Sequence, residues 1–122
     1  GGVSKSISDT LNRLRPDKPV KIKALQANGI KECKTILNDI MNNEIKANFY
    51  EGMGCPGGCV GGPKAILDVS KGTEYVNKYG AEATALTPAD NPHVLELLQQ
   101  LGINSVEELL EGEAAAIFQR KF

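Results

Sequence analysis

The sequence predicts an α/β fold, with a small βαβ-type core of parallel strands followed by C-terminal helices. Apolar residues recur every three or four positions near the N-terminus, which is typical of a helix. Residues 20–24 then alternate between apolar side chains and lysine, as in a strand with one wet face. A second helical pattern separates this strand from another short one. We therefore expect a right-handed crossover between parallel strands.

The first half of the chain contains four predicted elements. Residues 3–14 are expected to be helical, and prolines at 16 and 19 follow the helix. A strand is expected over 20–24. The next helix has an apolar stripe formed by Ile30, Cys33, Leu37, Ile40 and Met41. Residues 47–51 (ANFYE) are interpreted as a second strand that leads into a glycine-rich loop.

The second half is predicted to be helical. Residues 64–79 form a weak helical pattern, interrupted by Gly72 and capped by Gly80. Asn91 before Pro92 predicts the start of a helix that ends before Gly102. Ser105 and Glu108 have the spacing of a capping box, so a last helix is expected there, with a possible break at Gly112 before residues 114–118.

Composition limits the classes of function. The 122 residues include 14 basic and 15 acidic side chains, a net charge of −1, so we expect no nucleic-acid or membrane partner held by bulk charge. Three cysteines are too few for a disulfide scaffold, which favours a reducing, cytoplasmic compartment. We expect residues 1–122 to form a single domain, a C-terminal fragment of a larger protein.

The chemistry is concentrated in the segment 51–63, EGMGCPGGCVGGP. Pro56 and the glycines after it disfavour a regular helix, so this loop is expected to fold around a bound group. The thiolates of Cys55 and Cys59 suit an anionic iron–sulfur cluster. Glycine amides can approach such a group closely, and the candidates are Gly54, Gly57, Gly58, Gly61 and Gly62.

Other interpretations of this loop stay open. The C-x₃-C spacing is also compatible with a disulfide or a plain tight turn. A thioredoxin-like site would require C-x₂-C, and the G-x-G-x-x-G match at 52–57 has Pro56 where a dinucleotide-binding helix should begin. A P-loop is excluded because Pro63 follows Gly62.

The number of ligands is the main constraint on a cluster. A 4Fe–4S cube usually takes four cysteines. We interpret Cys33 as a buried structural thiol and His93 as an exposed residue at a helix start. Two ligands remain, so residues absent from this chain must complete any such site.

The pattern Glu51-x-Met53-x-Cys55-Pro-Gly-Gly-Cys59-x-Gly-Gly resembles the last cysteine motif of the iron-only (FeFe) hydrogenase large subunit, and the likeness covers about residues 18 to 65. The resemblance implies an H-cluster, a 4Fe–4S cube joined to a two-iron subcluster. Cys55 would ligate the cube, Cys59 would ligate it and bridge to the two irons, and Met53 would line the two-iron pocket. The other ligands and the proton-relay cysteine would lie in the remainder of the parent chain.

The resemblance also implies a function. The parent would be an oxidoreductase of an anaerobe that interconverts protons and hydrogen, with electron transfer from a ferredoxin-like donor. The isolated chain is expected to be inactive and to hold neither a stable four-cysteine 4Fe–4S cluster nor the two-iron subcluster. The family's three glycines, Gln and Pro are replaced here by Gly61, Gly62, Pro63 and Lys64, so the alternative is a non-catalytic electron-relay, sensor or docking module. A dithiol redox switch is a third possibility.

Overall fold

The computed structural model describes residues 2–109 and 113–120. These residues form two compact units, 1–84 and 85–122. The single domain expected over 1–122, and its origin as a fragment, stay predictions. None of the helices in the described ranges is long and apolar enough to cross a membrane.

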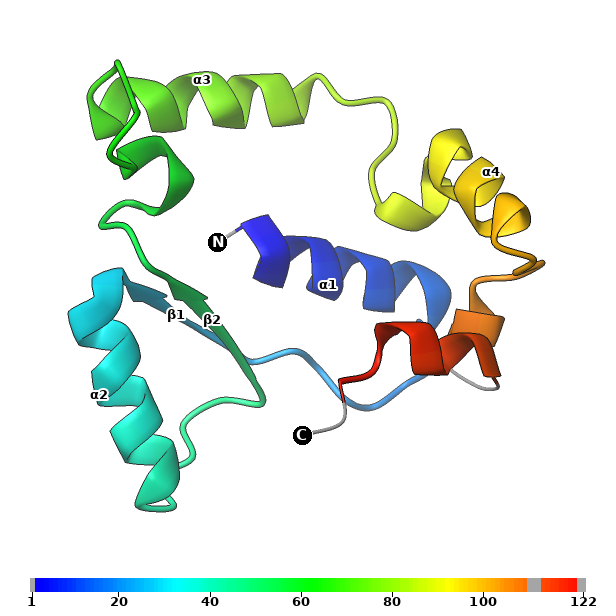
Figure 1. Cartoon of the computed structure of the whole chain (residues 1–122), viewed down its shortest axis with the longest axis horizontal. Helices are drawn as coiled ribbons and strands as arrows, with labels where there is room; N and C mark the ends of the chain where they lie inside the picture. Colours follow the sequence, from blue (N-terminus) through cyan, green and yellow to red (C-terminus); the bar gives the residue numbers. More distant parts are fainter. Residues whose placement is uncertain (1, 110–112, 121–122) are drawn as a thin grey trace. The chain divides into compact units, whose positions relative to one another are not determined.

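The first unit is built on the predicted βαβ arrangement. Helix α1 (Gly2–Leu14) is followed by strand β1 (Ala24–Asn28), helix α2 (Gly29–Met41) and strand β2 (Phe49–Met53). The two strands pair in parallel, with Ala24 opposite Phe49 and Asn28 opposite Met53. The α/β fold class and the parallel βαβ-type core are therefore confirmed (Figure 1).

Both strands lie further along the chain than predicted. The first does not cover 20–24 but begins at Ala24, because the side chain of Asn48 binds the Lys23 amide at 2.7 Å and the Lys21 carbonyl at 2.9 Å. The Asn48 side chain thus binds Lys21 and Lys23 just before the strand, and the Lys23 carbonyl accepts from the backbone amides of Asn48 and Phe49 at 3.1 and 3.4 Å. The alternation of Val20 and Ile22 did not mark the buried face, which is centred on Ala27, at 1% exposure.

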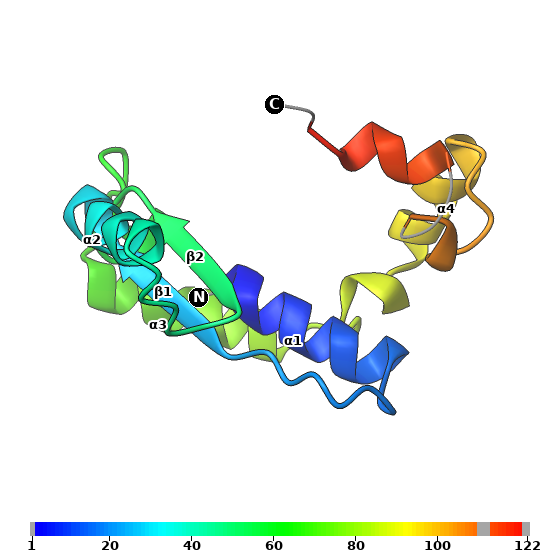
Figure 2. The same ribbon diagram turned by 90° about the horizontal axis from the view of Figure 1, so that it is seen from below.

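Helix α2 packs on the strands through a face that keeps only part of the predicted stripe. Its half-buried apolar side chains are Cys33 and Ile40, which were predicted, and Ile36, which was not, and they follow the buried Gly29. Three residues of the predicted stripe point to solvent instead: Ile30, Leu37 and Met41 are 63%, 59% and 80% exposed. Figures 1 and 2 show α1 and α2 on opposite sides of the two strands.

Helix α3 (Val69–Ala81) begins five residues later than the predicted 64–79 helix. The Asp68 side chain accepts a hydrogen bond from the Lys71 amide at 3.0 Å and so determines this start. Gly72 does not interrupt the helix but lies inside it, where its lack of a side chain permits close packing on Val60. Gly80 is likewise helical, and the C-cap is Glu82.

The second unit contains helix α4 (Pro92–Gln100), which starts as predicted. Asn91 accepts from the His93 amide at 3.0 Å, and Gly102 follows the helix with a φ of 77°. Leu98, Ile103 and Ala115 are its buried apolar residues.

The predicted last helix is replaced by short 3₁₀ segments, Glu107–Leu109 and Glu113–Phe118. The amide of Glu108 donates to the Ser105 hydroxyl at 3.4 Å, but the Glu108 carboxylate accepts from Asn104 and not from Ser105, so the capping box is incomplete. The predicted break at Gly112 lies outside the described residues.

Candidate functional site

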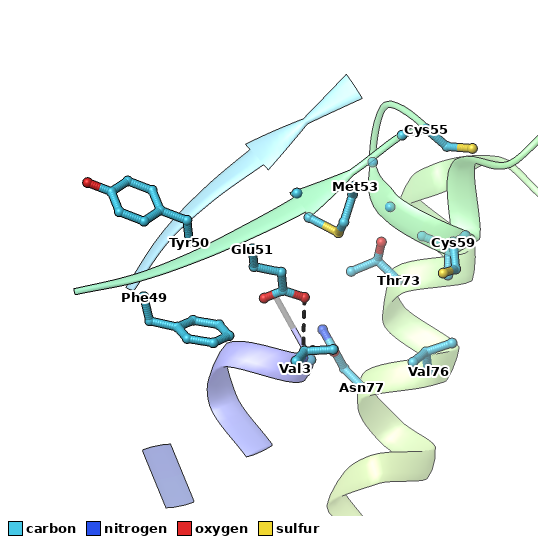
Figure 3. A pocket seen from close by; sticks show the side chains of 16 residues that line it. Val3, Phe49, Tyr50, Glu51, Met53, Cys55, Cys59, Thr73, Val76 and Asn77 are labelled. Atoms are coloured by element: carbon cyan, nitrogen blue, oxygen red, sulfur yellow. Dashed lines mark hydrogen bonds between the residues drawn. The ribbon is translucent and has the colours of Figure 1, made fainter. Parts of the chain in front are cut away.

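A pocket of about 810 Å³ lies at the end of β2, within the first unit. Its walls are the start of α1, strand β2, the cysteine and glycine loop, and one face of α3 (Figure 3). The labelled lining side chains are Val3, Phe49, Tyr50, Glu51, Met53, Cys55, Cys59, Thr73, Val76 and Asn77. Most of the predicted motif, including both cysteines, thus lines a cavity, whereas the candidate glycines Gly61 and Gly62 do not line it.

The loop has the irregular backbone that the sequence predicts. Gly57 and Gly58 have φ angles of 80° and 75°, which residues with a Cβ rarely adopt. The Gly58 amide donates to the Cys55 carbonyl at 3.0 Å, and a single 3₁₀ turn follows over Gly58–Gly61. Two glycines are therefore required by the turn itself.

The five candidate glycines do not share one environment. A Cβ on Gly61 would lie 2.0 Å from the Pro56 carbonyl oxygen, and one on Gly57 would lie 2.6 Å from Val69. Gly54 is different, because a Cβ there would meet nothing within 4 Å. Loop packing thus accounts for Gly57 and Gly61, whereas open space lies beside Gly54. Their binding role, and that of Gly58 and Gly62, stays a prediction.

Cys55 and Cys59 both line the pocket but do not bind each other. Cys55 is half-buried, Cys59 is exposed, and both are free thiols, so the disulfide alternative is not formed here. A Cβ on Gly62 would lie 3.9 Å from the Cys55 sulfur, so this thiol lies close to the C-terminal end of the loop. In Figure 3 the Cys59 side chain lies beside α3 and is separated from that of Cys55.

The thiols of Cys55 and Cys59 could supply two of the four ligands of a 4Fe–4S cube. Two thiols and the open space at Gly54 are compatible with iron–sulfur ligation. Within residues 2–109 and 113–120, no three His, Cys, Asp or Glu side chains form a group that could hold a metal ion. The ligand role of Cys55 and Cys59 therefore stays a prediction.

Met53 lies where the sequence predicts, in the pocket wall next to the loop. Its sulfur is 2.9 Å from the position that a Cβ on Gly58 would take, so the thioether and the loop are in close contact. A flexible, polarizable thioether can adapt to an irregular neighbouring surface. Met53 can therefore form an apolar wall for a bound group.

His93 is exposed as predicted, whereas Cys33 is half-buried and not buried; that neither residue is a ligand stays a prediction. Cys33 lies on α2, is half-buried, and its thiol donates to the Met53 carbonyl at 3.7 Å. It thus contacts the strand backbone and does not line the pocket. His93 lies in the second unit, with an 85% exposed side chain 3.2 Å from the Glu96 carboxylate.

Sequence reasoning missed a polar network that attaches α1 to β2. The Glu51 carboxylate accepts from the Ser4 hydroxyl at 2.5 Å, from the Ser4 amide at 3.1 Å and from the Val3 amide at 3.3 Å. The Ser4 hydroxyl also accepts from the Gln26 amide group at 2.7 Å. These hydrogen bonds, that of the Ser4 hydroxyl first, lower the pKa of Glu51.

This network gives α1 an N-terminal cap supplied by another element. An anionic carboxylate at a helix N-terminus compensates the amides that have no intrahelical partner. Ser4 is 3% exposed, so the contact is well packed. No sequence pattern indicated it, because Ser4 and Glu51 are 47 residues apart.

The sequence analysis also missed the α3 wall. Thr73, Val76 and Asn77 line the pocket from α3, which packs on the cysteine loop through Val69 and Gly72. The signal that could have identified them is the run Val69, Gly72, Thr73, Val76, a helical stripe of small and β-branched residues.

Residues 4–63 match the family model of the iron only hydrogenase large subunit, C-terminal domain. The resemblance inferred from the cysteine motif is therefore confirmed, and it extends back to the start of α1. No curated protein and no solved structure gives a match. Helix α3 and the second unit lie beyond the matched residues.

Proposed function

Because residues 4–63 match a hydrogenase family, we propose that this chain is the part of an iron–sulfur oxidoreductase that supplies Cys55 and Cys59 to a 4Fe–4S cube. The observation that supports this most directly is that both thiols line one pocket with Met53. In the intact protein the cube would be joined to a two-iron subcluster, and this H-cluster would interconvert protons and hydrogen.

Four residues of strand β2 and the cysteine loop each have a specific role in this proposal. Cys55 would ligate the cube, and Cys59 would ligate it and bridge to the two irons. Met53 would present its thioether to the two-iron side and exclude water from it. The Glu51 carboxylate accepts hydrogen bonds from the Val3 and Ser4 amides and so holds the start of α1, which forms another wall of the pocket, in place. The two further thiolates would come from the remainder of the parent chain, and electrons from a ferredoxin-like donor.

A non-catalytic electron-relay, sensor or docking module is the second candidate. It is favoured by the residues after Cys59, where Pro63 and Lys64 stand in place of the family's third glycine and glutamine. Here the chain would keep the cube ligands without turning over hydrogen. Hydrogen uptake or evolution by the intact protein distinguishes the two candidates.

The ligand assignment can be tested on this chain by anaerobic incubation with ferrous iron, sulfide and 2-mercaptoethanol, which supplies the missing thiolates. We expect an iron–sulfide chromophore that is lost in Cys55→Ala and in Cys59→Ala. Cys33→Ala is the matched control, since Cys33 is a thiol of the same chain that does not line the pocket. It should keep its iron.

Equal iron content in the wild type and in both pocket variants would overturn the proposal. If the wild-type chain binds no iron, the same variants are compared in the intact protein, which holds the other ligands, and equal iron content there would overturn the proposal. If the metal-free chain instead cycles reversibly between two free thiols and a Cys55–Cys59 disulfide, with no cysteine-dependent iron binding, the loop is a dithiol switch.

A further inference from the structure

We draw no further inference here: the strongest candidate, the outer edge of strand β2, whose residues Phe49–Met53 line the pocket and which has no second neighbouring strand among the described residues, carries nothing because nothing in the structure shows what covers it.

Discussion

The two sides of strand β2 differ in how closely they are packed. On the pocket side, a Cβ on Gly61 would overlap the Pro56 carbonyl, and Ser4 is almost fully buried. On the other side, α2 contacts the strands through half-buried residues and leaves Leu37 and Met41 exposed to solvent. The closer packing is therefore on the pocket side of β2, around the cysteine loop.

The comparison shows that residue type alone does not determine a thiol's environment. Cys33 and Cys59 belong to the same unit, yet the thiol of Cys33 donates to the backbone of β2, whereas Cys59 is exposed at the pocket. The apolar residues of α2 are equally ambiguous as a guide to packing. They form two overlapping helical stripes, and only the stripe that includes Ile36 contacts the strands. The position of each thiol relative to the strands decides whether it contacts the backbone or the pocket.

The largest effect is expected for Gly61→Ala. The new methyl group would lie within 2.0 Å of the Pro56 carbonyl oxygen, so the loop must shift, and we expect a loss of about 3 kcal/mol in the free energy of unfolding. Urea denaturation measures it. Gly54→Ala is the matched control, because its methyl group meets nothing within 4 Å and should change stability by less than about 0.5 kcal/mol. Equal effects would contradict the difference in packing.

Ser4→Ala should have the next largest effect. It removes the donor to Glu51 and the acceptor of Gln26 in a buried position, which costs about 1 to 3 kcal/mol. Ser6→Ala, on the same helix, is the control, because the Ser6 hydroxyl bonds to none of the described residues. A stability loss of the same size in both variants would contradict a specific role of the Ser4 hydroxyl, because helix propensity favours alanine over serine at both positions.

Acid should weaken the pocket side through Glu51. Its folded-state pKa is lowered below the ordinary value of 4.5, chiefly by the Ser4 hydroxyl. The carboxylate therefore contributes stability that is present above pH 4.5 and is lost as the pH falls through the folded pKa. Urea midpoints measured from pH 6 downward should fall less steeply below about pH 4.5 in Glu51→Gln than in the wild type. Parallel curves would exclude this contribution.

The smallest effect is expected on the α2 side. Met41 is 80% exposed, so Met41→Ala should change the free energy of unfolding by less than about 0.5 kcal/mol. Ile36→Ala, on the face that contacts the strands, should cost more because Ile36 is half-buried. Urea denaturation of the two variants locates the packed face of α2, and the reverse order would place it on the predicted stripe.

Local patterns were sufficient for much of the fold. The spacing of apolar residues predicts α1 and α2, and the Asn91 cap predicts the start of α4, because each depends on contacts between residues close in the chain. The strands were displaced because a side chain from residue 48 binds the backbone of 21–23, a long-range interaction. The start of α3 was missed because Asp68 was not recognised as its cap.

The sequence by itself determined the resemblance to the hydrogenase family over residues 4–63, the parallel βαβ arrangement and the loop that contains Cys55 and Cys59, since motif spacing and glycine content are local properties. Only the tertiary structure decided which glycines are crowded, which face of α2 is packed, that Ser4 binds Glu51, and that Glu51 and Asn77 line the same pocket. These features depend on residues far apart in the chain, whose proximity is created by folding.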